Sequence, residues 1–390
     1  MKKYLFFALA AVGMLSSCSS DDAVSSGSDP VDDNSLVPIR IGLGQTITRG
    51  TGTVGGFDDT NDNVWNQQEI NVFMLYKDSM ELALFQGAEL YNNSVFTTPN
   101  ALQTGLATPK DQSIKYYPPQ GKYDFWGYRL NDATILSSNG YDLSDDSLTI
   151  EFKIDGSQDV MLAKAVPSAA DTAKLVAAGD ATAERAFSSY AARHDVQPNL
   201  VFKHHLTRLT FEAIPGGVGA VSETSPVVID SIKVIAPNHG TMVVASTGDI
   251  RGEKQGIIWK ADKDSLVLKE RSAGDTPKDL QKLTSVSLRG KTVGQPVSVG
   301  EALLVAPDKN YDLVIFLHQN LPTQIGSAVS KTVKFDYKDV IQRAGDFNKG
   351  TSYKVQITLW GLTDIKITTT LTKWDEEDLP IDLRPEDQDL

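Results

Sequence analysis

The strongest constraint on the fold is an alternation of apolar and polar residues with a period of two. In LTIEFKID, at 148–155, the apolar residues would lie on one face of a strand and the polar residues on the other. The same alternation is found in YKVQITL, at 353–359, and in DIKITTTLT, at 364–372. Strands of this kind bury one face and expose the other, as in antiparallel sandwiches. The sequence therefore predicts an all-β fold.

Turn residues separate many further short apolar runs, which is typical of all-β proteins. The additional strand candidates are VPIRIGL, INVFMLY, YDFWGYRL, HLTRLTFEAI, VVIDSIKVI, SLVLKE, EALLVAP, DLVIFLH and TVKFDY. Residues 169–193 break the pattern, because they are rich in Ala, with β-branched residues sparse, and predict one or two short helices. A chain of 390 residues is too long for one ordinary core. We therefore expect two tandem antiparallel β-sandwich domains, at 37–198 and 199–390, with the boundary near Pro198.

The first residues, MKKYLFFALAAVGMLSSCSSDD, have the proportions of a bacterial signal peptide. A basic start precedes an apolar run from Tyr4 to Leu15 that is too short to span a bilayer as a helix. Cys18, the only cysteine, follows small residues as in the lipobox of lipoproteins, where the thiol is acylated and becomes the new N-terminus. We expect a signal peptide at 1–17 and a disordered tether, rich in Ser and Asp, at 18–36. The alternative is a buried free cysteine.

The charge balance bears on the partners of the chain. Acidic residues outnumber basic ones, with 50 Asp and Glu against 37 Lys and Arg, and the formal net charge is −13. No cluster of basic residues offsets this excess. Because binding to phosphate groups needs grouped cations, nucleic acid and anionic membrane surfaces are poor partners.

A glycine-rich stretch, TITRGTGTVGGFDD at 46–59, contains the pattern G-x-G-x-x-G of dinucleotide-binding loops. Such a loop needs a helix directly after it, and FDDTNDNVWNQQ has turn residues and no helical spacing. The dinucleotide interpretation is therefore rejected. Glycines make the backbone mobile and free of side chains, so Arg49 before Gly50 would be accessible to a trypsin-like protease. The alternative is a plain hairpin loop that carries an arginine.

Residues that could support catalysis or metal binding are scattered. His204 and His205 are adjacent on a predicted strand, so their side chains would point to opposite faces and not share a metal ion. LRGKTVG, at 288–294, contains the GKT of a phosphate loop but lacks its leading glycine and its helix, so we interpret it as a polar hairpin. The carboxylate pairs at 145–146 and 376–377 are expected at the surface. The sequence therefore predicts no enzyme, no metal and no cofactor.

Two stretches leave alternatives open. DDTNDNVW, at 58–65, groups oxygen ligands, and a weak calcium site at 58–63 is conceivable. It lacks the glycine and the distal glutamate of an EF-hand, so a solvated turn is the preferred interpretation. The aromatic residues crowded between 116 and 128 are interpreted as sandwich core, although an exposed subset could stack on sugar rings.

An ordered set of segments along the chain carries a resemblance to a known family. It begins with VPIRIGLGQTITRGTGTVGG and then W-x(4)-INVFMLY. It continues with IKYYPPQGKYDFWGYRL, IDGSQDVMLAKA and FKHHLTRLTFEAI, and it closes with NKGTSYKVQITLWGLTDIKITTTLTKW. The set resembles the fimbrillin family of pilus and surface-adhesion lipoproteins of Bacteroides-type bacteria. The resemblance implies two transthyretin-like β-sandwich domains and export to the outer membrane as a surface lipoprotein acylated (palmitate) on Cys18.

The resemblance also implies that an arginine-specific protease removes the first strand. On this sequence the cut is between Arg49 and Gly50, and the displaced strand lies within 37–47, with Val37, Ile39, Ile41 and Ile47 as its apolar residues. Removal of this strand would leave an open slot in the sheet, and a strand from another fimbrillin subunit would fill that slot by strand addition. The implied function is a subunit of a surface fimbrium that contributes to cell adhesion.

The position within a fimbrium follows less directly from the sequence. The acidic tail after Trp374 offers only Leu379–Leu383 as a pairing segment, and Pro380 confines it to an edge. A tip or accessory position is therefore at least as consistent with the sequence as a shaft position. The alternative function is a surface lipoprotein that binds glycan or a host ligand and does not polymerise.

Overall fold

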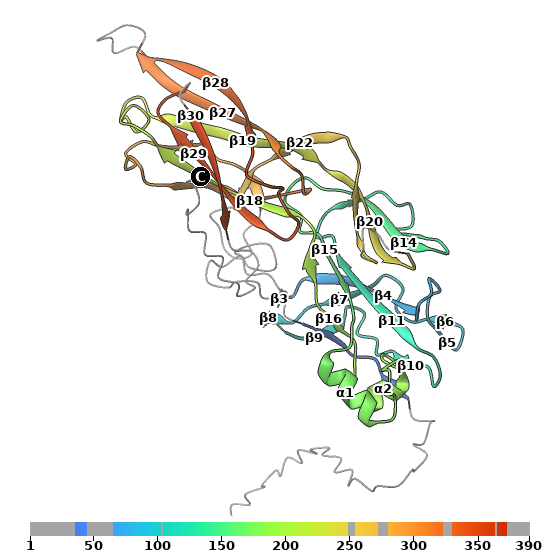
Figure 1. Cartoon of the computed structure of the whole chain (residues 1–390). Coiled ribbons are helices and arrows are strands. Elements are labelled where there is room, and N and C mark those ends of the chain that lie inside the picture. The colour runs from blue at the N-terminus through green and yellow to red at the C-terminus, as the bar shows by residue number, and fades with distance from the viewer. Residues whose placement is uncertain are drawn as a thin grey trace, which may run out of the picture. The chain divides into compact units, whose positions relative to one another are not determined.

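Figure 1 shows the computed structural model of the chain. The structure describes residues 36–44, 65–102, 104–248, 254–271, 280–322, 330–362 and 365–372. These residues belong to one compact unit. Strands dominate this part of the chain, so the predicted all-β class is confirmed.

The first sheet has eight strands, in the order β16-β2-β9-β7-β4-β11-β15-β17. In that order they are β16 (Asn199–Leu200), β2 (Ile41–Leu43), β9 (Gly105–Pro109), β7 (Ser94–Thr97), β4 (Glu69–Tyr76), β11 (Tyr123–Arg129), β15 (Met161–Lys164) and β17 (Lys203–His204). Its central strands are buried on both faces. In β4, Ile70 and Val72 lie in one apolar cluster, whereas Phe73 and Leu75 lie in a second cluster. Burial of both faces explains why INVFMLY contains the unbroken apolar run Val72–Leu75 rather than a strict alternation.

A second sheet has the order β12-β14-β20-β21, with β13 added beside β14. Its strands are β12 (Thr134–Ile135), β14 (Ser147–Lys153), β20 (His239–Ser246), β21 (Gly256–Trp259) and β13 (Asp142–Leu143). Leu148, Ile150 and Phe152 of β14 belong to the second cluster, which confirms the alternation predicted for this strand. Because β14 pairs with β20, strands from both sides of Pro198 share one sheet. The division into domains at 37–198 and 199–390 stays a prediction.

Two further sheets enclose a third apolar cluster. One has the order β26-β18-β29-β30 and the other β22-β19-β27-β28, with β25 beside β19. These strands are β26 (Val297–Val305), β18 (Thr207–Pro215), β29 (Ser352–Leu359), β30 (Ile365–Thr372), β22 (Lys263–Val267), β19 (Val227–Pro237), β27 (Tyr311–Pro322), β28 (Ser330–Ile341) and β25 (Val286–Ser287). Val355 and Ile357 of β29 share the cluster with Leu313 and Ile315 of β27, which is the arrangement of a β-sandwich. Among the pairs described, β18 with β29 and β2 with β16 are parallel.

In the ranges that the structure describes, two short helices interrupt the strands, α1 (Ala169–Ala177) and α2 (Ser189–Arg193). Both fall inside the helical insertion predicted at 169–193. Ser168 begins α1 with a capping box, in which its hydroxyl accepts from the Asp171 N–H and the Asp171 carboxylate accepts from the Ser168 N–H. Within the described ranges, neither helix is long and apolar enough to cross a membrane.

Four short pairs complete the described strands. They are β1 (Val37–Pro38) with β10 (Tyr116–Tyr117), β3 (Trp65–Asn66) with β8 (Asn100–Leu102), β5 (Leu84–Phe85) with β6 (Ala88–Glu89), and β23 (Lys269–Arg271) with β24 (Leu280–Lys282). Strand β1 leads directly into β2. The segment 36–44 therefore pairs first with β10 and then enters the eight-stranded sheet.

Candidate functional site

The first described segment, residues 36–44, enters the eight-stranded sheet as β2 (Ile41–Leu43), which lies between two other strands of that sheet. Strand β2 pairs antiparallel with β9 on one side and parallel with β16 on the other. Gly42 stands opposite Leu106 of β9 and Asn199 of β16. Both edges of the segment are therefore occupied, although β16 is only two residues long.

The backbone of this segment is hydrogen-bonded on alternate sides. The N–H groups of Gly42 and Gly44 donate to the carbonyl oxygens of Pro198 (2.8 Å) and Leu200 (3.0 Å). On the other side, the Ile39 N–H donates to the Lys115 carbonyl oxygen at 2.9 Å. Loss of the segment would leave carbonyl acceptors without partners on both walls of the vacated slot, and an unpaired buried backbone group is costly.

Gln197 adds side-chain contacts to the same segment. Its Oε1 accepts from the Arg40 N–H at 3.2 Å, and its Nε2 donates to the Pro38 carbonyl oxygen at 3.2 Å. The amide thus replaces a backbone partner at the point where the chain passes from β1 to β2. The segment has a polar contact at almost every residue.

The side chains of the segment separate onto two faces. Ile39, Ile41 and Leu43 are 6%, 1% and 2% exposed and belong to the first apolar cluster, against which the half-buried Val37 packs. Burial stabilises the folded state by about 1.5–3 kcal/mol for each large aliphatic side chain, relative to leaving that side chain exposed. An empty slot would therefore expose the apolar core of the sheet to water.

On the opposite face of the segment, positions 42 and 44 leave little room for a side chain, whereas Arg40 is exposed. A Cβ placed on Gly42 would lie 3.0 Å from Asn199 Oδ1, and one on Gly44 would lie 2.6 Å from Val201 Cγ2. Any strand that replaces this segment in the same register therefore needs large apolar residues on one face and glycine or another very small residue at the positions of Gly42 and Gly44.

Three of the four residues predicted for the displaced strand come together here, namely Val37, Ile39 and Ile41. Ile47, the predicted cleavage pair Arg49 and Gly50, the lipidation residue Cys18 and the possible calcium site at 58–63 lie outside the described residues. Sequence reasoning did not select Leu43, although the alternation from Val37 onward leads to it. It also missed Gln197 and strand β16, because no local pattern indicates a contact between residues so far apart in the chain.

The adjacent histidines are placed in different surroundings. His204 is buried, and its Nδ1 lies 2.7 Å from Asp159 Oδ1. The other oxygen of Asp159 is 3.8 Å from Arg129 Nη1. Burial lowers the pKa of Arg129, and attraction to Asp159 opposes that shift. His205 lines a pocket instead. No group of three metal-ligating side chains occurs in the part of the chain that the structure describes.

The other stretches singled out in the sequence have structural placements. LRGKTVG, at 288–294, forms turns with positive φ at Gly290 and Gly294 and leads into β26. The hairpin interpretation is wrong, because the flanking strands β25 and β26 pair with β19 and β18 in different sheets and not with each other. Asp145 and Asp146 are exposed, as expected. The aromatic run is core, as expected, since the members less than 3% exposed are Tyr117, Tyr123, Phe125, Trp126 and Tyr128.

Comparison with known proteins places the chain in a family. The model of the family described as Fimbrillin-like matches residues 58–374. No curated protein matches. Similar solved structures include a fimbrial protein of Bacteroides vulgatus, with TM-score 0.46, 12% identity, and coverage of 87% of this chain and 99% of that one. A candidate cell adhesion protein of Bacteroides uniformis has TM-score 0.43, 15% identity, and coverage of 89% and 100%. Because the family match extends over most of the sequence, the chain belongs to the fimbrillin-like family.

Proposed function

We propose that this protein is a subunit of a surface fimbrium, assembled after the segment 37–47 is removed and replaced by a strand of another subunit. The observation that carries the proposal is the position of β2 (Ile41–Leu43), within the segment 36–44, between β9 and β16. Removal of an edge strand would leave one unpaired wall, whereas removal of this segment leaves two. A donor strand in that slot gains backbone hydrogen bonds on both sides, each contributing about 0.5–1.5 kcal/mol.

The glycine-rich stretch supplies the means of removal. Arg49 precedes Gly50, and further glycines follow at 52, 55 and 56. Because glycine adopts many backbone conformations, such a stretch can enter the extended cleft of a protease. We propose an arginine-specific protease as the processing partner, with cleavage between Arg49 and Gly50.

The remaining parts of the proposal concern location and partners. Membership of the fimbrillin-like family supports a place at the cell surface and assembly with other fimbrial subunits. We propose that Cys18 carries the lipid that holds the unprocessed chain at the outer membrane. The role is structural and adhesive, and it requires no catalytic group.

The test is the N-terminus of the protein recovered from a Bacteroides-type host that expresses the full chain. We expect mass spectrometry to find Gly50 as the first residue, and gel electrophoresis without boiling to show a ladder of oligomers. In Arg49→Ala, the N-terminus should be acylated Cys18 and the ladder should disappear. Arg40→Ala is the matched control, because Arg40 lies within the paired segment, and it should still be cut at Gly50.

An intact acylated Cys18 in the wild-type protein, together with the absence of a ladder, would overturn the proposal. That result would support the alternative function, a surface lipoprotein that binds glycan or a host ligand and does not polymerise.

A further inference from the structure

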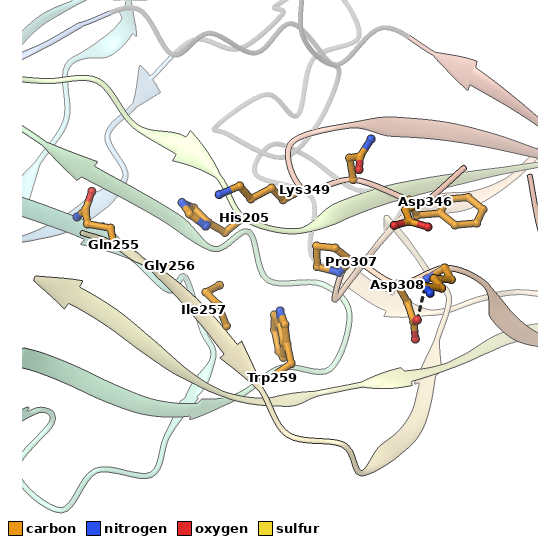
Figure 2. A pocket seen from close by; sticks show the side chains of 12 residues that line it. His205, Gln255, Gly256, Ile257, Trp259, Pro307, Asp308, Asp346 and Lys349 are labelled. Atoms are coloured by element: carbon orange, nitrogen blue, oxygen red, sulfur yellow. Dashed lines mark hydrogen bonds between the residues drawn. The ribbon is translucent and has the colours of Figure 1, made fainter. Parts of the chain in front are cut away.

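A pocket of about 510 Å³ lies beside β21, and none of its lining residues belongs to the segment 36–44. Its walls come from β21, from the loop between β26 and β27, from the loop between β28 and β29, and from His205 (Figure 2). This volume falls within the range of small-molecule binding sites. Figure 2 shows Ile257 and Trp259 on one side of the space, with Pro307 and Asp308 opposite them.

Trp259 forms a rigid apolar platform in this pocket. Phe152, Gly240 and Trp259 stand side by side on β14, β20 and β21. Because Gly240 has no side chain, the rings of Phe152 and Trp259 meet above it, with centroids 5.5 Å apart and planes at 69°. A Cβ on Gly240 would lie only 3.0 Å from Trp259 Cε3. The indole is held in place on this side, and its half-buried ring retains exposed surface in the pocket.

Two polar side chains are presented to the pocket by a well-anchored loop. The backbone of Asn348 accepts from the Thr207 hydroxyl at 2.9 Å and donates to the Tyr353 hydroxyl at 3.1 Å. The Phe347 N–H donates to the Asp308 carbonyl oxygen at 2.9 Å. Asp346 and Asn348 are exposed, and their side-chain polar atoms make no hydrogen bond to any other described residue. Their carboxylate and amide groups can therefore bind a ligand without breaking an internal contact.

The charges around the pocket nearly balance. Asp308 accepts from Lys263 at 2.8 Å, so this carboxylate is already neutralised. Asp346 is accompanied by two lysines that also line the space, Lys309 and Lys349, which leaves an excess of one cation. A site for a strongly anionic ligand would group several cations without acidic neighbours, and the lining of this pocket does not.

From these features we infer that the pocket binds a neutral sugar residue. A pyranose ring has an apolar C–H face that packs on an aromatic ring, and Trp259 offers such a ring. Its hydroxyl groups donate and accept hydrogen bonds, and the Asp346 carboxylate and the Asn348 amide supply acceptors and donors. This inference goes beyond strand exchange and does not depend on it, because none of these residues lies in the slot.

The inference is tested on the purified full chain with methyl glycosides of glucose, galactose, mannose and N-acetylglucosamine, by saturation-transfer NMR and by titration of tryptophan fluorescence. At least one glycoside is expected to bind. Trp259→Ala should weaken that binding about tenfold, the change expected for loss of one aromatic contact. Asn348→Ala and Asp346→Ala should each weaken it as well. Because both residues are exposed, these two variants are expected to remain folded.

Trp360→Ala is the matched control, because Trp360 is 40% exposed and packs against Gly216 outside the pocket. It should leave the sugar titration unchanged. The inference is overturned if no glycoside of the panel binds, or if binding survives unchanged in both Trp259→Ala and Asn348→Ala. Methyl glucuronide completes the panel, and a preference for this charged sugar would overturn the neutral-ligand assignment. All of these outcomes are independent of cleavage at Arg49.

Discussion

At the scale of single residues, two glycines determine what the first segment can be. A Cβ added at Gly42 would lie 3.0 Å from Asn199 Oδ1, and one added at Gly44 would lie 2.6 Å from Val201 Cγ2, so little room remains for a side chain at either position. Neither has a positive φ, so the requirement comes from close approach and not from backbone conformation. A glycine in a strand of this kind marks a place where another chain segment comes near.

Gly44→Val tests this close approach. The new Cβ would meet Val201 Cγ2 at 2.6 Å, so β2 or its neighbour must shift. We expect the free energy of unfolding to fall by about 1–3 kcal/mol, as for other overpacked sites. Thermal and urea unfolding measure the change. Gly361→Ala is the control, because a Cβ added at Gly361 would meet nothing within 4 Å, and it should unfold like the wild-type protein.

The carboxylate of Asp155 makes a pH-dependent contribution to the free energy of unfolding. Burial would raise its pKa, but hydrogen bonds from Lys269 and Ser157 outweigh burial and lower the pKa below its ordinary value. A carboxylate with a lowered folded-state pKa stabilises the protein above the unfolded pKa, near 3.9, and loses this contribution as the pH falls through the folded value. Because the side chain is half-exposed, the effect should be under about 1 kcal/mol.

The corresponding variant is Asp155→Asn. We expect it to be less stable than the wild-type protein at neutral pH and equally stable at the acid end, where the wild-type carboxyl is also protonated. Urea unfolding at a series of pH values gives the two curves. Asp145→Asn, at an exposed position, is the control and should follow the wild-type curve throughout. A constant difference between Asp155→Asn and the wild-type protein at all pH values would contradict the prediction.

At the scale of elements, the position of a strand in its sheet determines the pattern of apolar and polar residues in its sequence. Strands β14 and β29 alternate between buried and half-exposed residues, and the period of two identifies them directly. Strand β11 is buried at every residue, because apolar clusters lie on both of its faces. Its apolar run predicts a strand only through its length and its flanking turns.

Replacement of the first segment can be tested at this scale with a peptide. A chain that starts at Gly50 should unfold at a lower temperature than the full chain, because the slot between β9 and β16 is empty. A synthetic peptide of residues 37–47 should raise that temperature by binding the folded state. The same peptide with Val in place of Gly42 and Gly44 should have a much smaller effect, since Asn199 and Val201 lie too close to these positions for a larger side chain. Equal effects of both peptides would contradict specific insertion.

At the scale of the whole molecule, the second apolar cluster joins the two halves of the sequence. Phe73 and Trp126 share this cluster with Met242 and Val244, which lie beyond Pro198. The sheet that covers the cluster pairs β14 with β20 over seven positions. The sequence predicts two sandwich domains at 37–198 and 199–390. Because the shared sheet contains strands from both, the first domain alone would lack β20.

A fragment of residues 37–198 tests that question. Without β20, the cluster around Phe73 and Trp126 loses a covering strand, and apolar surface is exposed. We expect the fragment to bind the dye ANS and to unfold without a sharp transition. The chain from 37 to 390 is the control and should unfold cooperatively. A sharp transition of the isolated fragment would show that the shared sheet is not needed for its stability.

Local patterns by themselves determined much about this protein. The alternation of residues determined its β class, the composition of 169–193 determined its helical insertion, and the ordered segments pointed to its family, because each of these signals lies within a short stretch of chain. Only the tertiary structure decided that β2 lies between β9 and β16, that β14 pairs with β20, and that Trp259 faces Pro307 and Asp308 across one pocket. Strand pairing depends on packing between residues distant in sequence, and the period of a single strand carries no information about its neighbours.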